Sequence, residues 1–260
     1  MEVFVFPDSQ SMSAAAAKEV AEVLNAKPDA VLGIATGSTP LGLYQELVRM
    51  YQRREVDFSH VTTFNLDEYV GLPVTHPQSY HHFMHEHFFR HVNIPLQNIH
   101  IPSGTTTNYR SFCEWYEKRI VDAGGIDVQI LGIGSDGHIA FNEPGSSLSS
   151  RTRLKTLAPS TIDDNARFFK SRGEVPIYAI TMGVGTILEA RRVVLLATGK
   201  NKSAAIAAAV EGPVTAMITA SALQMHPDTQ VLLDEAAASG LNMRDYYDWV
   251  QENKPGAPKV

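Results

Sequence analysis

Short apolar runs alternate along the chain with longer segments in which apolar residues recur every three or four positions. The short runs are typical of buried strands, and the longer segments are typical of amphipathic helices. The predicted strands are Val3–Phe6, Ala30–Ala35, Val61–Leu66, Val128–Ile133, Ile177–Thr181, Val193–Ala197 and Thr229–Leu233. The predicted helices are Ser13–Ala26, Pro40–Arg53, Tyr109–Ala123, Asn201–Val210 and a shorter one after Ser160, where Ser160 and Asp163 resemble a capping box.

Strands that alternate with helices predict a parallel sheet covered by helices on both faces. The predicted fold class is therefore α/β, a three-layer αβα sandwich with an open, mostly parallel, Rossmann-like sheet. We interpret residues 1–260 as one domain, with a mobile lid around 145–185 or 73–92. The tail Glu252–Val260, which contains two prolines, is expected to fray.

Composition narrows the function classes. The hydrophobic content of 44% supports a sizeable core, and the net charge of -6 disfavours a nucleic-acid or membrane surface. An anionic substrate would therefore need a local positive pocket. Cys113 is the single cysteine, which excludes an internal disulfide and fits a reducing, cytoplasmic compartment. Because the sequence begins directly with a strand-like segment, we expect no secretory signal.

Three titratable residues follow one buried strand in quick succession. In the stretch Val128–Pro144, an apolar run ends in glycines and is followed by Asp136, His138 and Glu143. Asp136 and His138 are two positions apart and point to the same side of an extended loop, and Glu143 can fold back through a turn. Two carboxylates around one imidazole orient it and raise its pKa, which suits a general acid/base.

Two other interpretations of this loop compete with catalysis. In the first, the glycines only turn the chain and Asp136 caps a helix. In the second, Gly132–Gly137 satisfies G-x-G-x-x-G and binds a dinucleotide. That fingerprint also requires a helix after the glycines and an acidic residue about 20 positions further on. The sequence predicts neither, so nicotinamide binding is disfavoured.

Other strand ends supply groups that suit an anion. Gly37, Ser38 and Thr39 follow the strand Ala30–Ala35 in a turn before a predicted helix, where backbone N–H groups and hydroxyls form a phosphate-sized site. An ordinary helix cap is the alternative. Lys202 lies at the start of another helix, where a cation is unfavourable unless an anion is bound. Arg167 is a further candidate for binding a phosphate.

Asp67 is the first residue after the strand Val61–Leu66 and is expected to point into the same crevice as His138. Such a carboxylate can remove a proton from carbon, although it could also accept backbone N–H bonds in the turn. The histidine-rich segment Thr75–His91 follows. It lacks an H-E-x-x-H pattern and alternates histidines with apolar residues, so we expect an amphipathic helix that covers the site rather than a zinc centre.

Several motifs together resemble the glucosamine-6-phosphate deaminase family, in the same broad fold group as sugar-phosphate isomerases and 6-phosphogluconolactonases. They are Ala35–Pro40, Asn65–Tyr69, Gly134–Pro144, Ser150–Arg153, Asn165–Phe169 and Val210–Gly212. The resemblance runs almost from end to end. It implies reversible conversion of glucosamine 6-phosphate and water into fructose 6-phosphate and ammonia, in amino-sugar catabolism, with no metal or redox cofactor.

The resemblance also implies residue roles. Asp67 matches the base that moves a proton between C2 and C1, His138 matches the group that opens the sugar ring, and Asp136 and Glu143 match the carboxylates that hold it. The residues that match phosphate ligands are Gly37, Ser38, Thr39, Arg167 and Lys202. Those that match an effector pocket for N-acetylglucosamine 6-phosphate, found in oligomeric relatives, are Ser146, Arg153 and Lys155.

The partner expected is thus a small sugar phosphate, in a chain that could form a homo-oligomer. Two other function classes remain open. A 6-phosphogluconolactonase would share the fold and the phosphate site but would not need Asp67 at the aldose carbon. A non-catalytic sugar-phosphate sensor would keep the phosphate pocket and lose the acid/base set.

Overall fold

A seven-stranded parallel sheet forms the centre of the protein in a computed structural model that describes residues 1–254. In spatial order its strands are β1 (Glu2–Phe6), β10 (Thr229–Asp234), β9 (Arg192–Ala197), β6 (Val128–Leu131), β2 (Val31–Ile34), β3 (Thr62–Asn65) and β5 (Ile99–His100). From β2 the chain winds outward through β3 to β5, and then crosses back to β6 on the other side of β2. Ligands of open α/β sheets bind at such a reversal, at the carboxyl ends of the strands.

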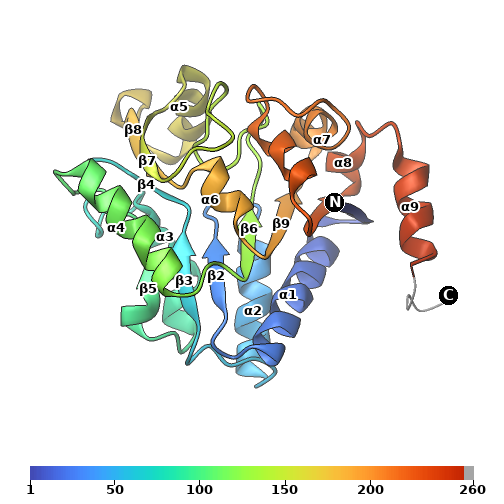
Figure 1. The fold of residues 1–260 in the computed structure, drawn as a ribbon, viewed down its shortest axis with the longest axis horizontal. Helices are drawn as coiled ribbons and strands as arrows, with labels where there is room; N and C mark the ends of the chain where they lie inside the picture. The colour runs from blue at the N-terminus through green and yellow to red at the C-terminus, as the bar shows by residue number, and fades with distance from the viewer. Residues whose placement is uncertain (255–260) are drawn as a thin grey trace.

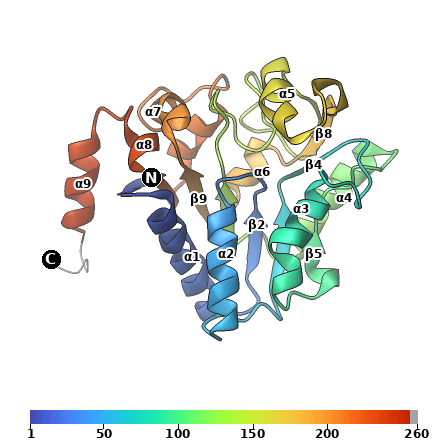
Figure 2. The same cartoon turned by 180° about the vertical axis from the view of Figure 1, so that it is seen from behind.

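Helices cover both faces of this sheet, so the predicted αβα sandwich is confirmed. On the face seen in Figure 2 lie α1 (Ser9–Ala26), α2 (Leu41–Gln52) and α3 (Tyr80–His87). On the face seen in Figure 1 lie α4 (Tyr109–Asp122), α6 (Val184–Leu188), α7 (Ser203–Val210) and α8 (Glu235–Ala238). Each face has its own buried apolar cluster, as expected for a parallel sheet that is covered on both sides.

Shorter elements complete the described chain. Helix α9 (Arg244–Glu252) lies beyond β1 at one edge of the molecule (Figure 1). The 3-10 turns are Phe89–His91, Leu96–Asn98, Ala166–Phe168, Arg172–Glu174, Lys200–Lys202 and Thr219–Met225. No helix within residues 1–254 is long and apolar enough to cross a membrane. The expected fraying of the tail falls, from residue 255 onward, outside the described residues.

A second, small sheet lies above the carboxyl edge of the large one, together with α5 (Pro159–Asn165) (Figure 1). Its strands are antiparallel and follow the order β4 (Asp67–Tyr69), β8 (Tyr178–Thr181) and β7 (Arg153–Thr156). The sequence placed Ile177–Thr181 in the parallel sheet, and this placement is wrong. An apolar run of this length predicts a strand but not its partners, and β4 continues from β3 with an edge free to pair with β8.

The predicted capping box at Ser160 is also wrong. Helix α5 begins at Pro159, with Ala158 as its N-cap and no side-chain cap. Pro159 has no N–H and a fixed φ, which suits a first helical position. The N–H of Ala158 instead donates to Glu143 Oε1 over 3.0 Å. This contact ties the start of α5 to the loop that carries His138.

Candidate active site

A cavity of about 590 Å³ opens where the strand order reverses. Its walls come from the loops after β2, β3, β6 and β9, and from the segment around α5. The predicted site residues that line it are Gly37, Ser38, Thr39, Asp67, His138, Arg167 and Lys202. The structure therefore brings into one cavity groups that lie more than half the chain apart, as expected from the convergence of parallel strand ends.

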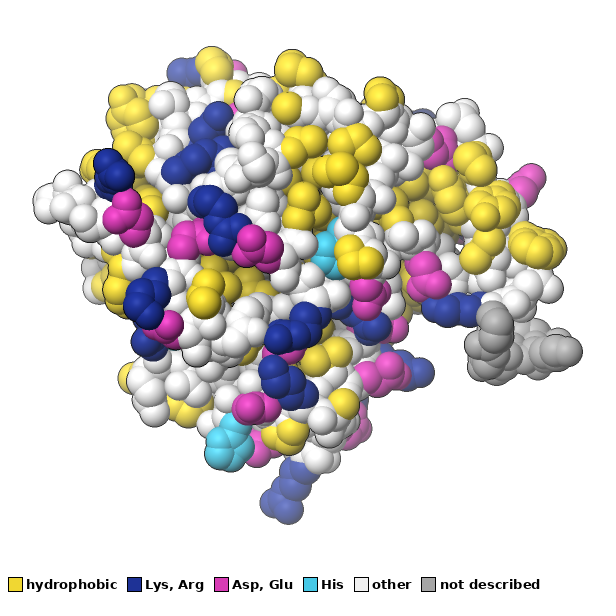
Figure 3. Space-filling view, viewed as in Figure 1, with side chains coloured by type: hydrophobic (Ala, Val, Ile, Leu, Met, Phe, Trp, Pro, Cys, Tyr) yellow, Lys and Arg dark blue, Asp and Glu magenta, His cyan; other side chains and the backbone are white. Residues whose placement is uncertain are grey.

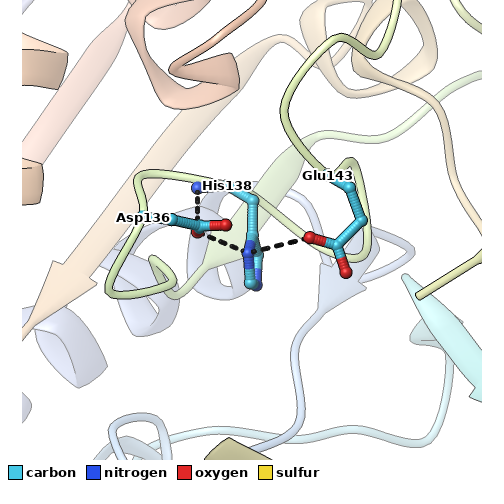
Figure 4. Close-up of side chains that lie close together, drawn as sticks. All are labelled: Asp136, His138 and Glu143. Carbon is cyan, nitrogen blue, oxygen red and sulfur yellow. Dashed lines mark hydrogen bonds and ion pairs between the residues drawn. The ribbon is translucent and has the colours of Figure 1, made fainter. Parts of the chain in front are cut away.

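Asp136 and Glu143 flank the imidazole of His138 without lining the cavity themselves (Figure 4). Asp136 Oδ1 lies 2.7 Å from His138 Nδ1 and also accepts the His138 backbone N–H over 3.2 Å. Glu143 Oε2 lies 3.7 Å from the same Nδ1 atom. Burial alone would raise the pKa of Asp136, but the hydrogen bonds and charge of His138 outweigh it and hold that pKa below its ordinary value. Both carboxylates therefore face the same ring nitrogen, which leaves Nε2 as the ring nitrogen able to exchange protons with a ligand.

The ring of His138 lies directly against the backbone of Gly134. A Cβ atom at position 134 would be 2.4 Å from His138 Cε1, so a side chain cannot be placed there without moving the ring. Gly137, one residue before the histidine, has φ +86°, which other residues adopt only with strain. The position of the ring thus requires glycine at 134, and the backbone conformation favours glycine at 137. Neither requirement involves a phosphate.

Asn142 anchors the other end of the loop. Its side-chain Nδ2 donates to the carbonyls of Ile139 and Met182, over 3.0 Å and 2.9 Å. Its own carbonyl accepts from Thr219 Oγ1 over 2.9 Å. Because Asn142 precedes Glu143 and follows His138 by four residues, these bonds fix the loop segment between the imidazole and its second carboxylate.

Asp67 is the first residue of β4, with 6% of its surface exposed, and it lines the cavity. Burial raises the pKa of Asp67 to about 8, and the neighbouring Glu68 carboxylate adds to the shift. A carboxyl with such a pKa exchanges protons near neutral pH, where an ordinary aspartate is always ionised. These are the properties required of a group that both removes and returns a proton.

Another part of the cavity wall carries groups that suit an anion. Gly37, with φ +109°, turns the chain after β2. Ser38 and Thr39 follow in the turn that leads into α2. Lys202 ends a 3-10 turn before α7, and burial together with the charge of Arg167 lowers its pKa, against the effect of Asp164 and Asp136. Hydroxyls, backbone N–H groups and two cations form a pocket suited to a phosphate.

Two other ligands suggested by the sequence are a dinucleotide and a metal ion. No helix starts after Gly137 until α5 at Pro159, so the dinucleotide fingerprint lacks its helix N-terminus. Within residues 1–254, Asp136, His138 and Glu143 are the set of His, Cys, Asp or Glu residues whose ligand atoms could converge on a metal, all lying within 4.8 Å. Both carboxylates already contact the same imidazole nitrogen, which is the arrangement of an oriented acid/base.

The three expected effector residues, Ser146, Arg153 and Lys155, do not line one common cavity. A second cavity, of about 620 Å³, lies between α4 and β7 and is lined by Arg153 but by neither Ser146 nor Lys155. Ser146 is buried. Arg153 donates to Asn142 Oδ1 over 2.9 Å, and burial lowers its pKa. The structure therefore joins Arg153 to the loop that carries His138.

Sequence analysis missed several residues in the wall of the first cavity. They are Tyr80, Phe141, Thr161, Asp164, Asn165, Phe168 and Asn201. Tyr80 begins α3, after the helix cap Ser79 in the histidine-rich segment. Ser79 followed by Tyr80 indicates a helix start in the sequence. The sequence pattern does not show that this helix start lies at the carboxyl edge of the sheet, beside the cavity.

Comparison with known proteins agrees with this geometry. Residues 7–232 match the model of the glucosamine-6-phosphate isomerase and 6-phosphogluconolactonase family. The chain is 53% identical over 251 residues to a glucosamine-6-phosphate deaminase of Shewanella halifaxensis, covering 96% of this chain and 95% of the relative. It is 52% identical over 255 residues to the same enzyme of an Arthrobacter species, covering 98% of each.

Solved structures with the same fold include a deaminase and a lactonase. A monomeric glucosamine-6-phosphate deaminase superposes with a TM-score of 0.91 at 43% identity, covering 92% of this chain and all of that one. A 6-phosphogluconolactonase from Trypanosoma cruzi has a TM-score of 0.72 at 21% identity, which shows a shared fold. The chain belongs to the glucosamine-6-phosphate isomerase and 6-phosphogluconolactonase family, and its relatives at about half identity are glucosamine-6-phosphate deaminases.

Proposed function

We propose that the protein is a glucosamine-6-phosphate deaminase, which converts glucosamine 6-phosphate and water into fructose 6-phosphate and ammonia by aldose-ketose isomerisation. The observation that carries this proposal is that Asp67 and an imidazole held by two carboxylates line the same cavity as a phosphate-sized anion pocket. An aldose-to-ketose shift needs one base that reaches two adjacent carbons, and a separate acid/base for the ring.

His138 opens the pyranose ring in this proposal. Its Nε2 takes the proton of the C1 hydroxyl and returns a proton to the ring oxygen, which gives the open-chain aldehyde. Asp136, 2.7 Å from Nδ1, and Glu143 stabilise the imidazolium formed on the way. The contact with Gly134 limits where the ring can lie.

Asp67 then moves the carbon-bound proton. When it takes the proton from C2, one proton of the substrate's C2 ammonium group moves to O1, which gives a neutral enol-amine. Returning the first proton to C1 then leaves an iminium carbon at C2. Water adds to that carbon and ammonia leaves, so that the ketose is formed. The pKa of about 8 suits both halves of this transfer, because the carboxyl can be a base before the step and an acid after it.

The phosphate end holds the flexible open chain. Ser38, Thr39, Arg167 and Lys202 line one part of the cavity, and their interactions with a phosphate lie far from C1 and C2. Binding energy from such a remote group lowers the barrier by fixing the reacting carbons. We propose a mobile lid around residues 145–185, which contribute Arg167 and Phe168 to the cavity wall, or around 73–92, which contribute Tyr80.

We propose a cytoplasmic enzyme that needs no cofactor and binds neither nucleic acid nor membranes. On the face shown in Figure 3, Lys and Arg lie among Asp and Glu instead of forming a basic stripe. A homo-oligomer is the state that an effector site at Ser146, Arg153 and Lys155 would require for cooperative kinetics. Light scattering, with substrate curves measured with and without N-acetylglucosamine 6-phosphate, tests that state.

Ammonia release from glucosamine 6-phosphate, coupled to formation of fructose 6-phosphate, tests the main proposal. A lactonase would instead release acid from 6-phosphogluconolactone and leave glucosamine 6-phosphate unchanged. A sensor would bind the sugar phosphate without turnover. Either result with the purified chain would overturn the deaminase assignment.

A further inference from the structure

Glu68 is a fully buried carboxylate that the proposed mechanism does not use. Its side chain has 0% exposed surface, and it directly follows Asp67 in β4. Oε1 accepts the N–H groups of Tyr69 and Tyr80, over 2.8 Å and 3.0 Å. Oε2 accepts the backbone N–H of His81 over 3.1 Å and lies 2.9 Å from its ring Nδ1. Four nitrogen groups from two elements therefore converge on one buried side chain.

The bonds of Glu68 occupy the N-terminus of α3. Tyr80 and His81 are the first two residues of that helix, whose N–H groups have no partner within the helix. The usual cap, Ser79, accepts only the N–H of His82, over 3.1 Å. A carboxylate at a helix N-terminus is also favoured by the helix dipole. Glu68 thus joins β4 to α3, although ten residues of chain separate them.

Both elements that Glu68 joins supply the wall of the active cavity. Asp67 precedes it in the strand, and Tyr80, whose N–H it accepts, comes from the helix. We propose that Glu68 is a positioning residue for the proton transfer: its buried carboxylate fixes β4 against the first turn of α3, and so fixes Asp67 and Tyr80 in the cavity wall. This inference rests on the proposed function for the role of Asp67.

Charge supports the same assignment. The negative charge of Glu68 favours the protonated form of Asp67 and so helps to raise its pKa, after burial. The tyrosines around Asp67 carry no charge near pH 7, since the ordinary pKa of a tyrosine is about 10 and burial raises it further. They are Tyr69, Tyr80 and Tyr116. His81 is the further titratable neighbour, and it faces Glu68. A change of charge at Glu68 should therefore be felt directly at Asp67.

The test uses Glu68→Gln, which keeps the size of the side chain and removes its charge. In protein labelled with ¹³C at aspartate carboxyls, with Asp67→Asn to assign the signal, we expect the pKa of Asp67 to fall by about one unit. The acid limb of the kcat/KM profile should move to lower pH by the same amount, and kcat should fall.

Ser79→Ala is the matched control, because it removes the other cap of α3 and leaves the charge of Glu68 in place. It should lower thermal stability without moving either the Asp67 titration or the acid limb. Glu68→Asp keeps the charge but withdraws the carboxylate from α3, so it should lower kcat while the pKa of Asp67 stays high. If Glu68→Gln does not fold, the kcat of Glu68→Asp tests whether Glu68 positions Asp67.

An unchanged Asp67 titration in Glu68→Gln, with normal kcat in Glu68→Asp, would show that Glu68 is only a helix cap. Ammonia release by the wild-type chain is measured in parallel. If the wild type releases none, the proposed function fails, while the carboxyl titration in the free protein still shows whether Glu68 acts on Asp67.

Discussion

The guanidinium of Arg153 donates a hydrogen bond to Asn142 Oδ1 over 2.9 Å, and Asn142 lies between His138 and Glu143 in the loop that follows β6. Asn142 is fully buried, and its amide nitrogen is bonded to the carbonyls of Ile139 and Met182. A residue that matches an effector ligand is thus connected, through one side chain, to the loop that carries His138, the proposed acid/base.

Arg153→Met should therefore lower the basal kcat in the absence of any effector. Losing a charged hydrogen bond to a buried amide loosens the loop, and we expect roughly a tenfold loss, with little change in KM. Arg151→Met is the control, since Arg151 is paired with Glu117 and Glu189 at the surface. It should stay within about twofold of wild type. Normal basal kcat in Arg153→Met, with loss of an effector response alone, would contradict this.

Gly134→Ala should disturb catalysis more than stability. The added methyl group would meet the ring of His138, so the imidazole must shift by a fraction of its own width. A misplaced catalytic group costs roughly a hundredfold in kcat. Gly132→Ala, in the same loop, also adds a methyl group to the cavity wall, but that methyl group meets no protein atom and leaves the ring in place. Its kcat should therefore stay close to the wild type. Equal kcat values for the two variants would show that the ring tolerates the displacement.

Lys202→Met should weaken binding of the substrate. Lys202 lines the cavity, and a charge-assisted bond to a phosphate contributes about 1.5 to 3 kcal/mol, so KM should rise roughly 10- to 100-fold. Lys200→Met is the matched control, because Lys200 lies in the same 3-10 turn but is exposed and outside the cavity wall. If both variants keep the wild-type KM, Lys202 is only a surface cation.

The strands of the main parallel sheet other than β5, together with the position of the site, could be predicted from sequence because both depend on local patterns. Strand β5 has only two residues, which is too short for an apolar run. The apolar runs over β2, β6 and β9 predicted strands, and parallel strand ends must converge, which placed Lys202 and His138 near one another. The antiparallel sheet could not be found in the same way. Strand β7 alternates half-buried with exposed residues, and β4 has only three.

Side-chain contacts between segments that are distant in the sequence could not be predicted either. Glu68 looks like one more polar residue in a turn, and nothing local shows that it meets Tyr80 and His81 at the start of α3. The need for glycine at position 134 depends on the ring of a residue four positions later. Such requirements arise from side-chain positions in three dimensions, so a glycine-rich motif alone could equally indicate a phosphate loop.

Asp67→Asn should change how stability depends on pH. The pKa of Asp67 is about 8 in the folded protein and about 4 when unfolded. As pH rises from 4 to 8 the unfolded chain loses this proton and the folded chain keeps it, so the wild type loses stability relative to the variant. The slope should approach about 1.4 kcal/mol per pH unit and level off above pH ~8.

Chemical denaturation from pH 5 to 9 measures this difference. Asp57→Asn is the control, because hydrogen bonds from Asn93 and Ser59 lower the pKa of Asp57. That carboxyl is ionised in both states above pH ~5, so its difference from wild type should be flat over this range. Parallel curves for wild type and Asp67→Asn would mean that Asp67 ionises in the folded protein at ordinary acidic pH.

The division of labour between His138 and Asp67 gives the sharpest prediction, because the two side chains come from different strand ends and act on different bonds. Asp67→Asn should bind glucosamine 6-phosphate yet lose roughly a hundred- to ten-thousandfold in kcat, with no solvent deuterium at C1 of fructose 6-phosphate. His138→Gln should still process the small open-chain fraction through the intact Asp67, and its product should carry deuterium. Its rate of ammonia release should therefore stop rising with enzyme concentration once spontaneous ring opening becomes limiting. Near-normal deamination by Asp67→Asn would show that another group moves the carbon-bound proton, and a rate in His138→Gln that stays proportional to enzyme concentration would show that ring opening does not depend on His138.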